Sequence, residues 1–229
     1  MTRGILLAGN ESTLLSAIAA EAAKRVESYA TAIIPNRFPL PDGVIPIKQE
    51  SPGKAIPLSW NPGSPISARS LVLASENRLT QINNAILICS PPAVYKTTSA
   101  LTPEEIEILV NDHIKGWFFL IRELSLYFRR IGSGSLALVT LEPNPDTGKN
   151  IQTDILGPAA AASFRTFVNG ILPMAANEPF QLMGFMGSEA AEEEFAPLLF
   201  KIIDEDGEKK NSGRWHRFQK RGFLKYGQR

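Results

Sequence analysis

Residues 4–26 read GILLAGNESTLLSAIAAEAAKRV, and this stretch decides the predicted fold. The apolar run Gly4–Ala8 is typical of a central parallel strand, and it breaks at Gly9 and Asn10. Apolar residues then return at helical spacing, at Leu14, Leu15, Ile18 and Ala22. The stretch therefore predicts a buried strand, a glycine turn and a helix, which is how a βαβ unit begins.

The rest of the chain continues this alternation. Thr102–Glu105 is a capping box with proline at the first helical position, so a helix is expected to begin there. Further strands are expected at 28–35, 55–60, 85–89, 135–141, 180–185 and 213–218, and helices at 67–79, 103–130, 158–176 and 189–203. This order predicts an α/β fold, a Rossmann-like doubly wound parallel sheet of about seven strands with helices on both faces. The proline-rich segment 38–53 is predicted to be irregular.

Composition limits the range of protein classes. A chain of 229 residues with 44% hydrophobic content suits one domain, residues 1–229, and the net charge of +1 gives no general attraction to nucleic acid. The segment 209–229 is basic and is expected to form a last strand and tail. Cys89 is the single cysteine, which excludes an intramolecular disulfide and favours the cytoplasm. The short N-terminal apolar run predicts neither a signal peptide nor a membrane span.

From Gly4 to about Gly222 the order of elements resembles the short-chain dehydrogenase/reductase family. Against the family pattern T-G-x-x-x-G-x-G, Gly9 holds the first glycine, while Thr13 and Leu15 stand at the second and third. The resemblance implies a site for NAD(P) at the N-terminus of the first helix. The two lost glycines imply that side-chain bulk obstructs the pyrophosphate, so no cofactor is expected.

The resemblance suggests three residues for a remnant of the cofactor site. Gly9 is the surviving glycine of the first turn. Arg37 lies just past the second strand, where it could meet a 2′-phosphate, although a solvated loop arginine fits the position equally well. Asn61 stands where the family often carries an aspartate that touches the adenine ring. Should the chain bind a cofactor at all, these residues predict NAD(P).

The family's catalytic set is mostly missing. The family uses a tyrosine as general acid/base, a lysine four residues later and a serine at the end of a strand. The alignment puts Ala161 at the tyrosine, Arg165 at the lysine and Leu141 at the serine, and no register supplies a tyrosine. Thr140 offers a hydroxyl one step before Leu141, which points the other way in a regular strand. Asn111 matches the family's helix asparagine, and local hydrogen bonding within the helix is the alternative.

The remaining reactive side chains predict no further chemistry. Cys89 lies inside an expected strand without a nearby histidine, which indicates a small core residue and not a nucleophile. His113 and His216 lack partners at the spacing of metal ligands.

Three function classes follow. The first is a catalytically silent family member that binds a partner or small molecule as an oligomeric module. The second is a divergent NAD(P)-dependent oxidoreductase with Arg37 and Arg165 on phosphates. The third, nucleic-acid binding through 209–229, is disfavoured because its alternating basic and aromatic residues also suit a half-buried strand.

The two longest predicted helices also suggest self-association. Residues 103–130 carry more apolar surface than one sheet can cover, and residues 158–176 begin with the alanine run 159–162. In the family these helices commonly pair across a two-fold axis. The resemblance therefore predicts a homo-dimer or tetramer with Trp117, Phe118 and Phe119 in or near the interface.

Overall fold

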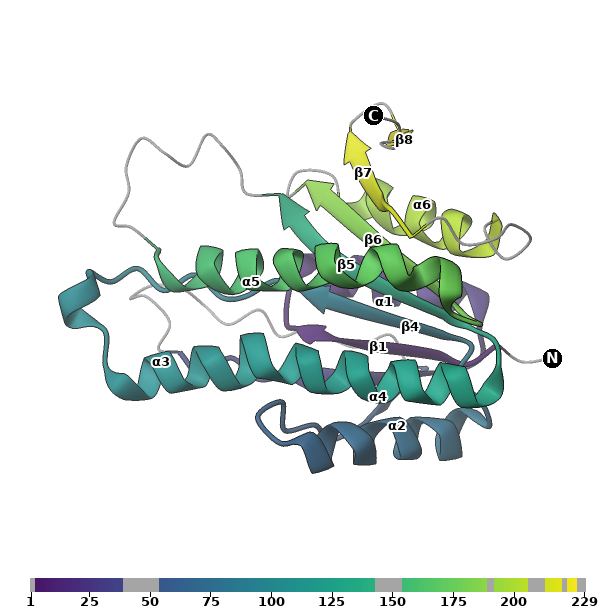
Figure 1. The fold of residues 1–229 in the computed structure, drawn as a ribbon, viewed down its shortest axis with the longest axis horizontal. Coiled ribbons are helices and arrows are strands. Elements are labelled where there is room, and N and C mark those ends of the chain that lie inside the picture. Colours follow the sequence, from purple (N-terminus) through teal and green to yellow (C-terminus); the bar gives the residue numbers. More distant parts are fainter. Residues whose placement is uncertain are drawn as a thin grey trace.

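The strand β1 (Ile5–Asn10) lies inside an eight-stranded sheet of the order β3-β2-β1-β4-β5-β6-β7-β8 (Figure 1). The computed structural model describes residues 3–38, 54–142, 154–188, 192–205, 213–219 and 222–225. The other strands are β2 (Tyr29–Ile34), β3 (Ala55–Pro57), β4 (Asn84–Cys89), β5 (Ser135–Glu142), β6 (Gln181–Ser188), β7 (Trp215–Gln219) and β8 (Gly222–Lys225). All pair in parallel except β7 with β8. The predicted doubly wound sheet is confirmed.

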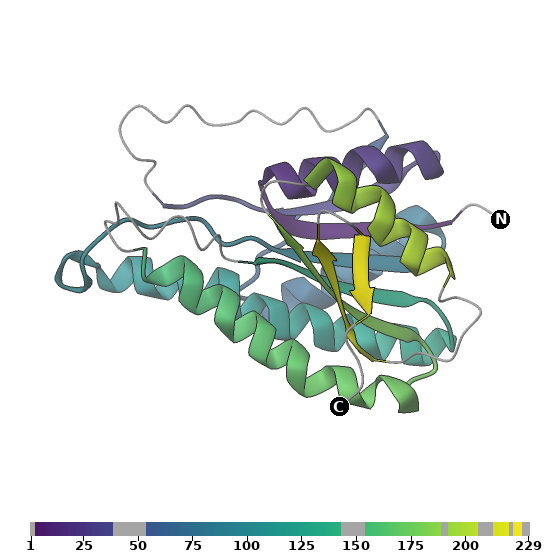
Figure 2. The ribbon, with the colours of Figure 1, turned by 90° about the horizontal axis from the view of Figure 1, so that it is seen from above.

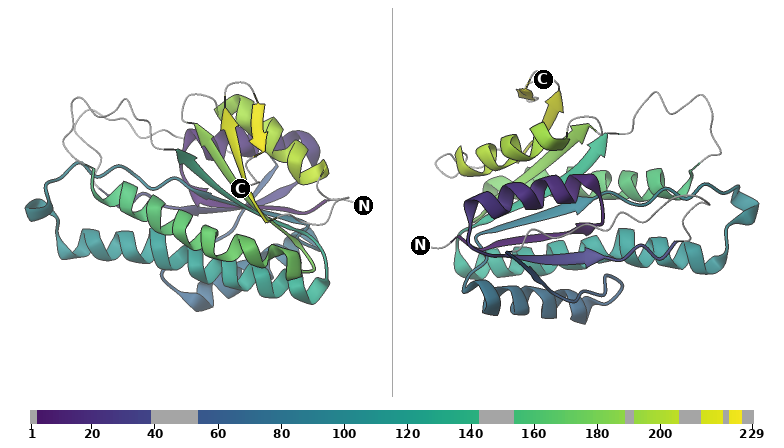
Figure 3. Two further views of the ribbon diagram at one scale, coloured as in Figure 1. Left: turned by 45° about the horizontal axis from the view of Figure 1, so that its top comes forward. Right: turned by 180° about the vertical axis from the view of Figure 1, so that it is seen from behind.

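The helices cover both faces of this sheet (Figure 2). On one face lie α1 (Thr13–Arg25) and α6 (Glu192–Glu205), which face the viewer in the right panel of Figure 3. The other face carries α2 (Pro65–Leu79), α4 (Gly116–Ile131) and α5 (Leu156–Ile171). Shorter helices are α3 (Pro103–Val110), the π turn η2 (Asn111–Lys115) and the 3₁₀ helices η1 (Thr98–Ala100) and η4 (Leu172–Asn177). In the described part of the chain, no helix is long and apolar enough to span a bilayer.

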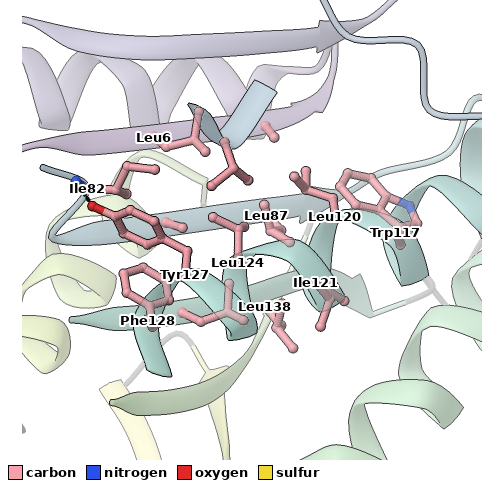
Figure 4. Packing of buried hydrophobic residues seen from close by; sticks show 14 of the residues in the cluster. Leu6, Ile82, Leu87, Trp117, Leu120, Ile121, Leu124, Tyr127, Phe128 and Leu138 are labelled. Carbon is pink, nitrogen blue, oxygen red and sulfur yellow. Dashed lines mark hydrogen bonds between the residues drawn. The ribbon is translucent and has the colours of Figure 1, made fainter. Parts of the chain in front are cut away.

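Each face of the sheet has its own hydrophobic core, because side chains alternate between faces along every strand. The core under α2, α4 and α5 includes Leu6, Leu87 and Leu138 from three neighbouring strands. Figure 4 shows how α4 packs there with a row of buried side chains, Trp117, Leu120, Ile121, Leu124 and Phe128. The Tyr127 hydroxyl accepts a hydrogen bond of 2.8 Å from the Ile82 N–H, so this buried phenol is satisfied. This row fixes α4 against β4 and β5.

Several predicted boundaries differ from the structure. Gly9 lies in β1, so the turn consists of Glu11 and Ser12, and Ser12 accepts a 3.1 Å hydrogen bond from the Leu15 N–H as the N-cap of α1. The expected single helix 103–130 is divided by the π turn η2. The expected strand 55–60 ends at Pro57, and the expected helix 158–176 gives way to a 3₁₀ helix after Ile171.

The C-terminal end also differs from the prediction. The strand β8 was not predicted as a separate strand, and it turns the predicted final strand into a hairpin with β7. The irregular segment predicted at 38–53 lies outside the described residues, apart from Phe38. Much of the basic segment 209–229 also lies outside them.

Candidate binding site at the carboxyl ends of the strands

Gly9 is required by the packing of β1 against β4. It pairs in register with Ile88, and a Cβ added at Gly9 would lie 2.8 Å from the Ile88 carbonyl oxygen. A methyl group cannot be accommodated there without a shift of one strand. The surviving glycine therefore has a structural role that needs no pyrophosphate beside it.

The two residues at the lost glycine positions lie in different environments. Thr13 is exposed at the first position of α1. Leu15 is buried at 3% exposure in the core between α1, α6 and the sheet. The expectation that Leu15 obstructs the pyrophosphate is wrong, because its side chain points into that core. Glu11 is exposed directly before the N-cap, where a negative side chain opposes the approach of a phosphate.

At the end of β2, Arg37 is paired with a buried carboxylate from η2. Its Nε lies 3.3 Å from Asp112 Oδ2, and the two side chains are 45% and 1% exposed. Burial raises the pKa of the Asp112 carboxyl, and the Arg37 guanidinium opposes that rise. The contact is an ion pair and not a well-formed hydrogen bond, since both Asp112 oxygens lack a donor among the described residues. A 2′-phosphate would have to compete with Asp112 for Arg37.

Beside this pair lies a neutral imidazole. Asn10, the last residue of β1, places its Nδ2 3.4 Å from His113 Nδ1, and the Phe38 ring stacks on the His113 ring at 6.2 Å between centroids. Burial, together with the positive charge of Arg37, lowers the pKa of His113 to about 4. The histidine therefore carries no charge at neutral pH.

These five residues, Asn10, Arg37, Phe38, Asp112 and His113, are called the β1–β2 cluster below. Phe38 also belongs to a small apolar core with residues that follow β4 and residues of α3 and α5: Val94, Leu109, Leu156 and Ala160. In this fold, dinucleotides bind at the carboxyl ends of the strands beside the point where the strand order reverses. Here that point lies between β1 and β4, and side chains of the chain itself occupy it.

A second group of polar side chains surrounds Cys89 at the ends of β4 and β5. Cys89 and Thr140 are register neighbours, and both lie on the face covered by α4 and α5. The Trp117 indole N–H faces the Cys89 sulfur, and the Arg165 guanidinium is close enough for its charge to act on the thiol. Burial nevertheless raises the pKa of Cys89 far above its usual range, so the thiol is inert as a nucleophile.

This second group consists of Trp117, Thr140 and Arg165, each of which has a hydrogen-bond donor without a partner, and is called the donor cluster below. Trp117 Nε1, Thr140 Oγ1 and Arg165 Nη1 are all buried, and none has a hydrogen-bond partner within the described ranges. The neighbouring indole N–H of Trp60 is also buried and unpaired. The Trp117 ring packs between those of Trp60 and Phe164, each 5.6 Å away between centroids. The cluster is therefore lined by aromatic rings.

The residues at the predicted catalytic positions lie in different surroundings. Leu141 packs in the α1 and α6 core, so Thr140 and not Leu141 faces α5. The expectation that the Thr140 hydroxyl points away from the site is thus corrected, because α5 and Arg165 lie on the face to which Thr140 points. Ala161 is half-buried and has no proton to donate.

Two further predicted residues lie outside both clusters. Asn111 is half-buried and its Oδ1 accepts a 2.8 Å hydrogen bond from Lys115 Nζ, which agrees with the local alternative. Asn61 lies exposed at the turn before α2, and its backbone N–H donates to Ser67 Oγ at 2.8 Å.

Sequence reasoning missed Asn10, Phe38 and Asp112. Asn10 offered a signal, since it directly follows an apolar strand that points at the ligand edge of the fold.

Solved structures resemble this chain over nearly its whole length. An NADH-dependent reductase, A1-R′, in complex with NAD superposes with a TM-score of 0.67 at 12% identity, covering 95% of each chain. A short chain dehydrogenase from Mycobacterium smegmatis gives 0.68 at 12% identity, covering 95% of this chain and 92% of that one. The fold is that of the short-chain dehydrogenases/reductases. A Serratia marcescens short-chain dehydrogenase/reductase variant gives 0.64 at 12% identity, covering 94% and 95%. No family model and no curated protein sequence matches the chain.

Proposed function

We propose that this chain is a divergent, catalytically silent relative of the short-chain dehydrogenases/reductases and acts as a binding module. The observation that carries the proposal is the β1–β2 cluster. Arg37 is paired with Asp112, and Phe38 is stacked on His113, at the edge where this fold receives a dinucleotide. A cofactor would have to displace a buried aromatic contact and an ion pair before it could bind.

The catalytic positions support the same proposal. Ala161 stands where the family resemblance places the proton donor, and removing a general acid costs about 10²-fold to 10⁴-fold in rate. Arg165 stands at the lysine position and does not replace the missing tyrosine. Ala161 cannot perform the proton transfer that a carbonyl reduction requires.

Direct titration with NADH and NADPH tests the proposal. We expect no saturable change in NADH fluorescence and no rise in melting temperature at cofactor concentrations that saturate an ordinary dehydrogenase. Phe38→Ala removes the ring that covers His113, and Ile66→Ala, at a side chain that is 77% exposed, is the control. If the β1–β2 cluster is the obstacle, the Phe38 variant should gain cofactor response and the control should not. Saturable binding to the unaltered protein would overturn the proposal.

The second candidate is an NAD(P)-dependent oxidoreductase of the same family. Its support is the fold, which this chain shares with an NADH-dependent reductase solved with NAD. This candidate predicts cofactor binding in the titration above and NAD(P)H-dependent turnover on a panel of carbonyl compounds. Turnover that persists through purification and disappears in an Arg165→Met variant would favour it.

We further propose that the protein forms a homo-dimer or tetramer through α4 and α5 and resides in the cytoplasm, with no membrane or nucleic-acid partner. Phe118 and Phe167 stack at 4.2 Å between ring centroids, and Leu126 is 44% exposed, so apolar surface continues along these helices. Trp117 is 0% exposed within the protomer, so on this proposal it lies beneath the interface and Phe118 and Phe119 lie closer to the partner.

Light scattering tests the assembly. Phe119→Glu on α4 should dissociate the oligomer, whereas Leu73→Glu on α2, at a side chain that is 49% exposed, should not. A monomer of 25.1 kDa in the unaltered protein at micromolar concentration would remove the interface from the proposal.

A further inference from the structure

We propose that the donor cluster binds a small organic carboxylate, with Arg165 as its charge partner and Trp117 and Thr140 as additional hydrogen-bond donors. The inference rests on the proposed function, because it names the class of ligand that a non-catalytic module would hold. It concerns the ends of β4 and β5 and not the β1–β2 cluster.

The first argument is the lack of acceptors. Trp117 and Thr140 are 0% and 1% exposed, and their polar atoms, like Arg165 Nη1, have no partner in the described part of the chain. A buried donor without an acceptor loses the hydrogen bond that water would have given it, which costs about 1–3 kcal/mol. An indole and a guanidinium have donors only, so the missing group must be an acceptor.

The second argument is convergence on one point. Thr140 and Cys89 are neighbours on β5 and β4, and both are directed toward α4 and α5. Trp117 comes to Cys89 from α4, and Arg165 comes from α5. The Trp117 ring also packs on Phe164, the residue before Arg165, so polar atoms from β5, α4 and α5 lie around Cys89, whose sulfur is only a weak acceptor.

The third argument concerns charge. Arg165 has no acidic partner among the described residues, so the cluster carries one uncompensated positive charge. A carboxylate supplies one negative charge and two oxygens that match the guanidinium fork, which makes the pair neutral. A phosphate dianion would leave an excess negative charge beside aromatic rings, and a water molecule would supply an acceptor without any charge.

The surroundings specify the rest of the ligand. The rings of Trp60 and Phe164 flank Trp117, and they offer apolar surface to the carbon part of a carboxylate. Since the donors are buried, the ligand must be small. Short-chain aliphatic and single-ring aromatic carboxylates therefore fit this chemistry better than sugars or nucleotides.

Calorimetric titration of the full chain at neutral pH tests the inference, with butyrate and benzoate as probes. The matched neutral compounds are butyramide and benzamide, and inorganic phosphate is the third arm. We expect saturable binding and a raised melting temperature with at least one carboxylate, and no response to its amide or to phosphate. Absence of binding by both carboxylates would leave water as the acceptor and overturn the inference. An equal response to the amides or to phosphate would overturn it as well.

Two variants and a control locate the binding. Arg165→Met should weaken carboxylate binding about thirtyfold or more, because the charge partner of the carboxylate is lost. Without ligand this variant should melt at about the same temperature, since Arg165 is half-buried and makes no ion pair with a described residue. Thr140→Val should weaken binding less. Arg69→Met, at an exposed arginine of α2, should change nothing.

A variant that does not fold can be distinguished from a wrong inference. If Arg165→Met does not fold, Arg165→Lys keeps the charge without the fork and should still weaken binding. Unchanged affinity in the folded variants would place the ligand elsewhere and overturn the inference. The NADH titration separates this test from that of the proposed function. Binding of neither NADH nor carboxylate refutes only the inference, whereas binding of NADH refutes the proposed function.

Discussion

The two halves of the carboxyl edge of the sheet have opposite polar chemistry. Over β1 and β2 the chain supplies both charges itself, in the Arg37–Asp112 pair, and the rings of Phe38 and His113 stack beside that pair. Over β4 and β5 it supplies buried polar atoms that have no hydrogen-bond partner among the described residues, including Nη1 of the charged Arg165. The polar atoms of the donor cluster lack partners among the described residues, whereas Arg37 and Asp112 lie together. The proposed function and the further inference therefore place ligand binding on the side of Arg165.

A dinucleotide in this fold would need both halves, because its adenosine lies at the end of β2 and its reactive ring lies near α5. A small carboxylate needs only one. On the proposed function, this division of the edge is how the chain would combine the fold of a dehydrogenase with a closed cofactor site. Four predictions, from the largest expected effect to the smallest, can break or sharpen this contrast.

The largest effect is expected at Trp117, which anchors the donor cluster to the core. Its ring is 0% exposed and contacts Trp60 and Phe164. Trp117→Ala should lower the free energy of unfolding by about 3–5 kcal/mol, as large-to-small changes of buried aromatic residues do. Urea denaturation measures it, with Ile66→Ala as the exposed control. A loss under 1 kcal/mol, about the level of a surface change, would mean that Trp117 serves an interface and not the core.

The second effect concerns pH and the β1–β2 cluster. The pKa of His113 is about 4 in the folded chain and 6.5 in the unfolded one, so the unfolded state binds more protons between these values. Stability therefore falls as the pH is lowered from 6.5 toward 4, by about 3 kcal/mol at most. The raised pKa of Asp112 acts in the opposite direction, because protonation of that buried carboxyl favours folding.

Denaturation curves of the unaltered chain and of His113→Gln over this pH range test the second prediction. The glutamine carries no titrating group, so the variant should lose most of the pH dependence of stability above about pH 5.5, where ordinary glutamates are almost fully charged. Identical slopes in the two proteins would show that His113 is not buried in a neutral form.

The fold was predictable because its signals are local and repeated. The apolar strand Ile5–Asn10 and the capping box at Thr102 each specify their element within a few residues. The π turn at Asn111–Lys115 was not predicted, because the helical spacing of apolar residues continues through it. Directly after it, a Cβ at Gly116 would lie 2.4 Å from the Pro62 Cβ, a contact that no helical pattern reveals.

The candidate site was predicted only in part for the same reason. Arg165 was found because an alignment assigns it to a known position, and Arg37 because it follows a strand. Their partners were not found. The Arg37–Asp112 pair joins the loop after β2 to η2, and the Trp117 contact joins α4 to β4. Such pairs depend on how layers pack, which sequence spacing does not encode.

The third prediction concerns Gly9. A Cβ at this position would meet the Ile88 carbonyl oxygen at 2.8 Å, and neither backbone can yield without disturbing the ladder between β1 and β4. Gly9→Ala should therefore cost about 1–3 kcal/mol of unfolding free energy, the usual range for overpacking. Gly170→Ala on α5 is the matched control, because a Cβ there meets nothing within 4 Å. Thermal denaturation of both variants should show a drop only for Gly9→Ala. An unaffected variant would return Gly9 to a role in ligand binding.

The smallest effect is expected from the Arg37–Asp112 pair, and it bears most directly on the contrast between the two halves. Arg37 is 45% exposed, so water screens its charge, and the coupling energy with Asp112 should be about 1 kcal/mol. A double-mutant cycle with Arg37→Gln and Asp112→Asn measures this coupling by urea denaturation. If the pair closes the β1–β2 half against phosphate, Asp112→Asn alone should free Arg37 and give NADPH a larger effect on the melting temperature than NADH. If neither NADPH nor NADH changes the melting temperature of Asp112→Asn, Phe38 and His113 alone suffice to close that half. A coupling near zero would mean that Arg37 is a solvated loop residue, and the two halves would then differ in packing but not in charge.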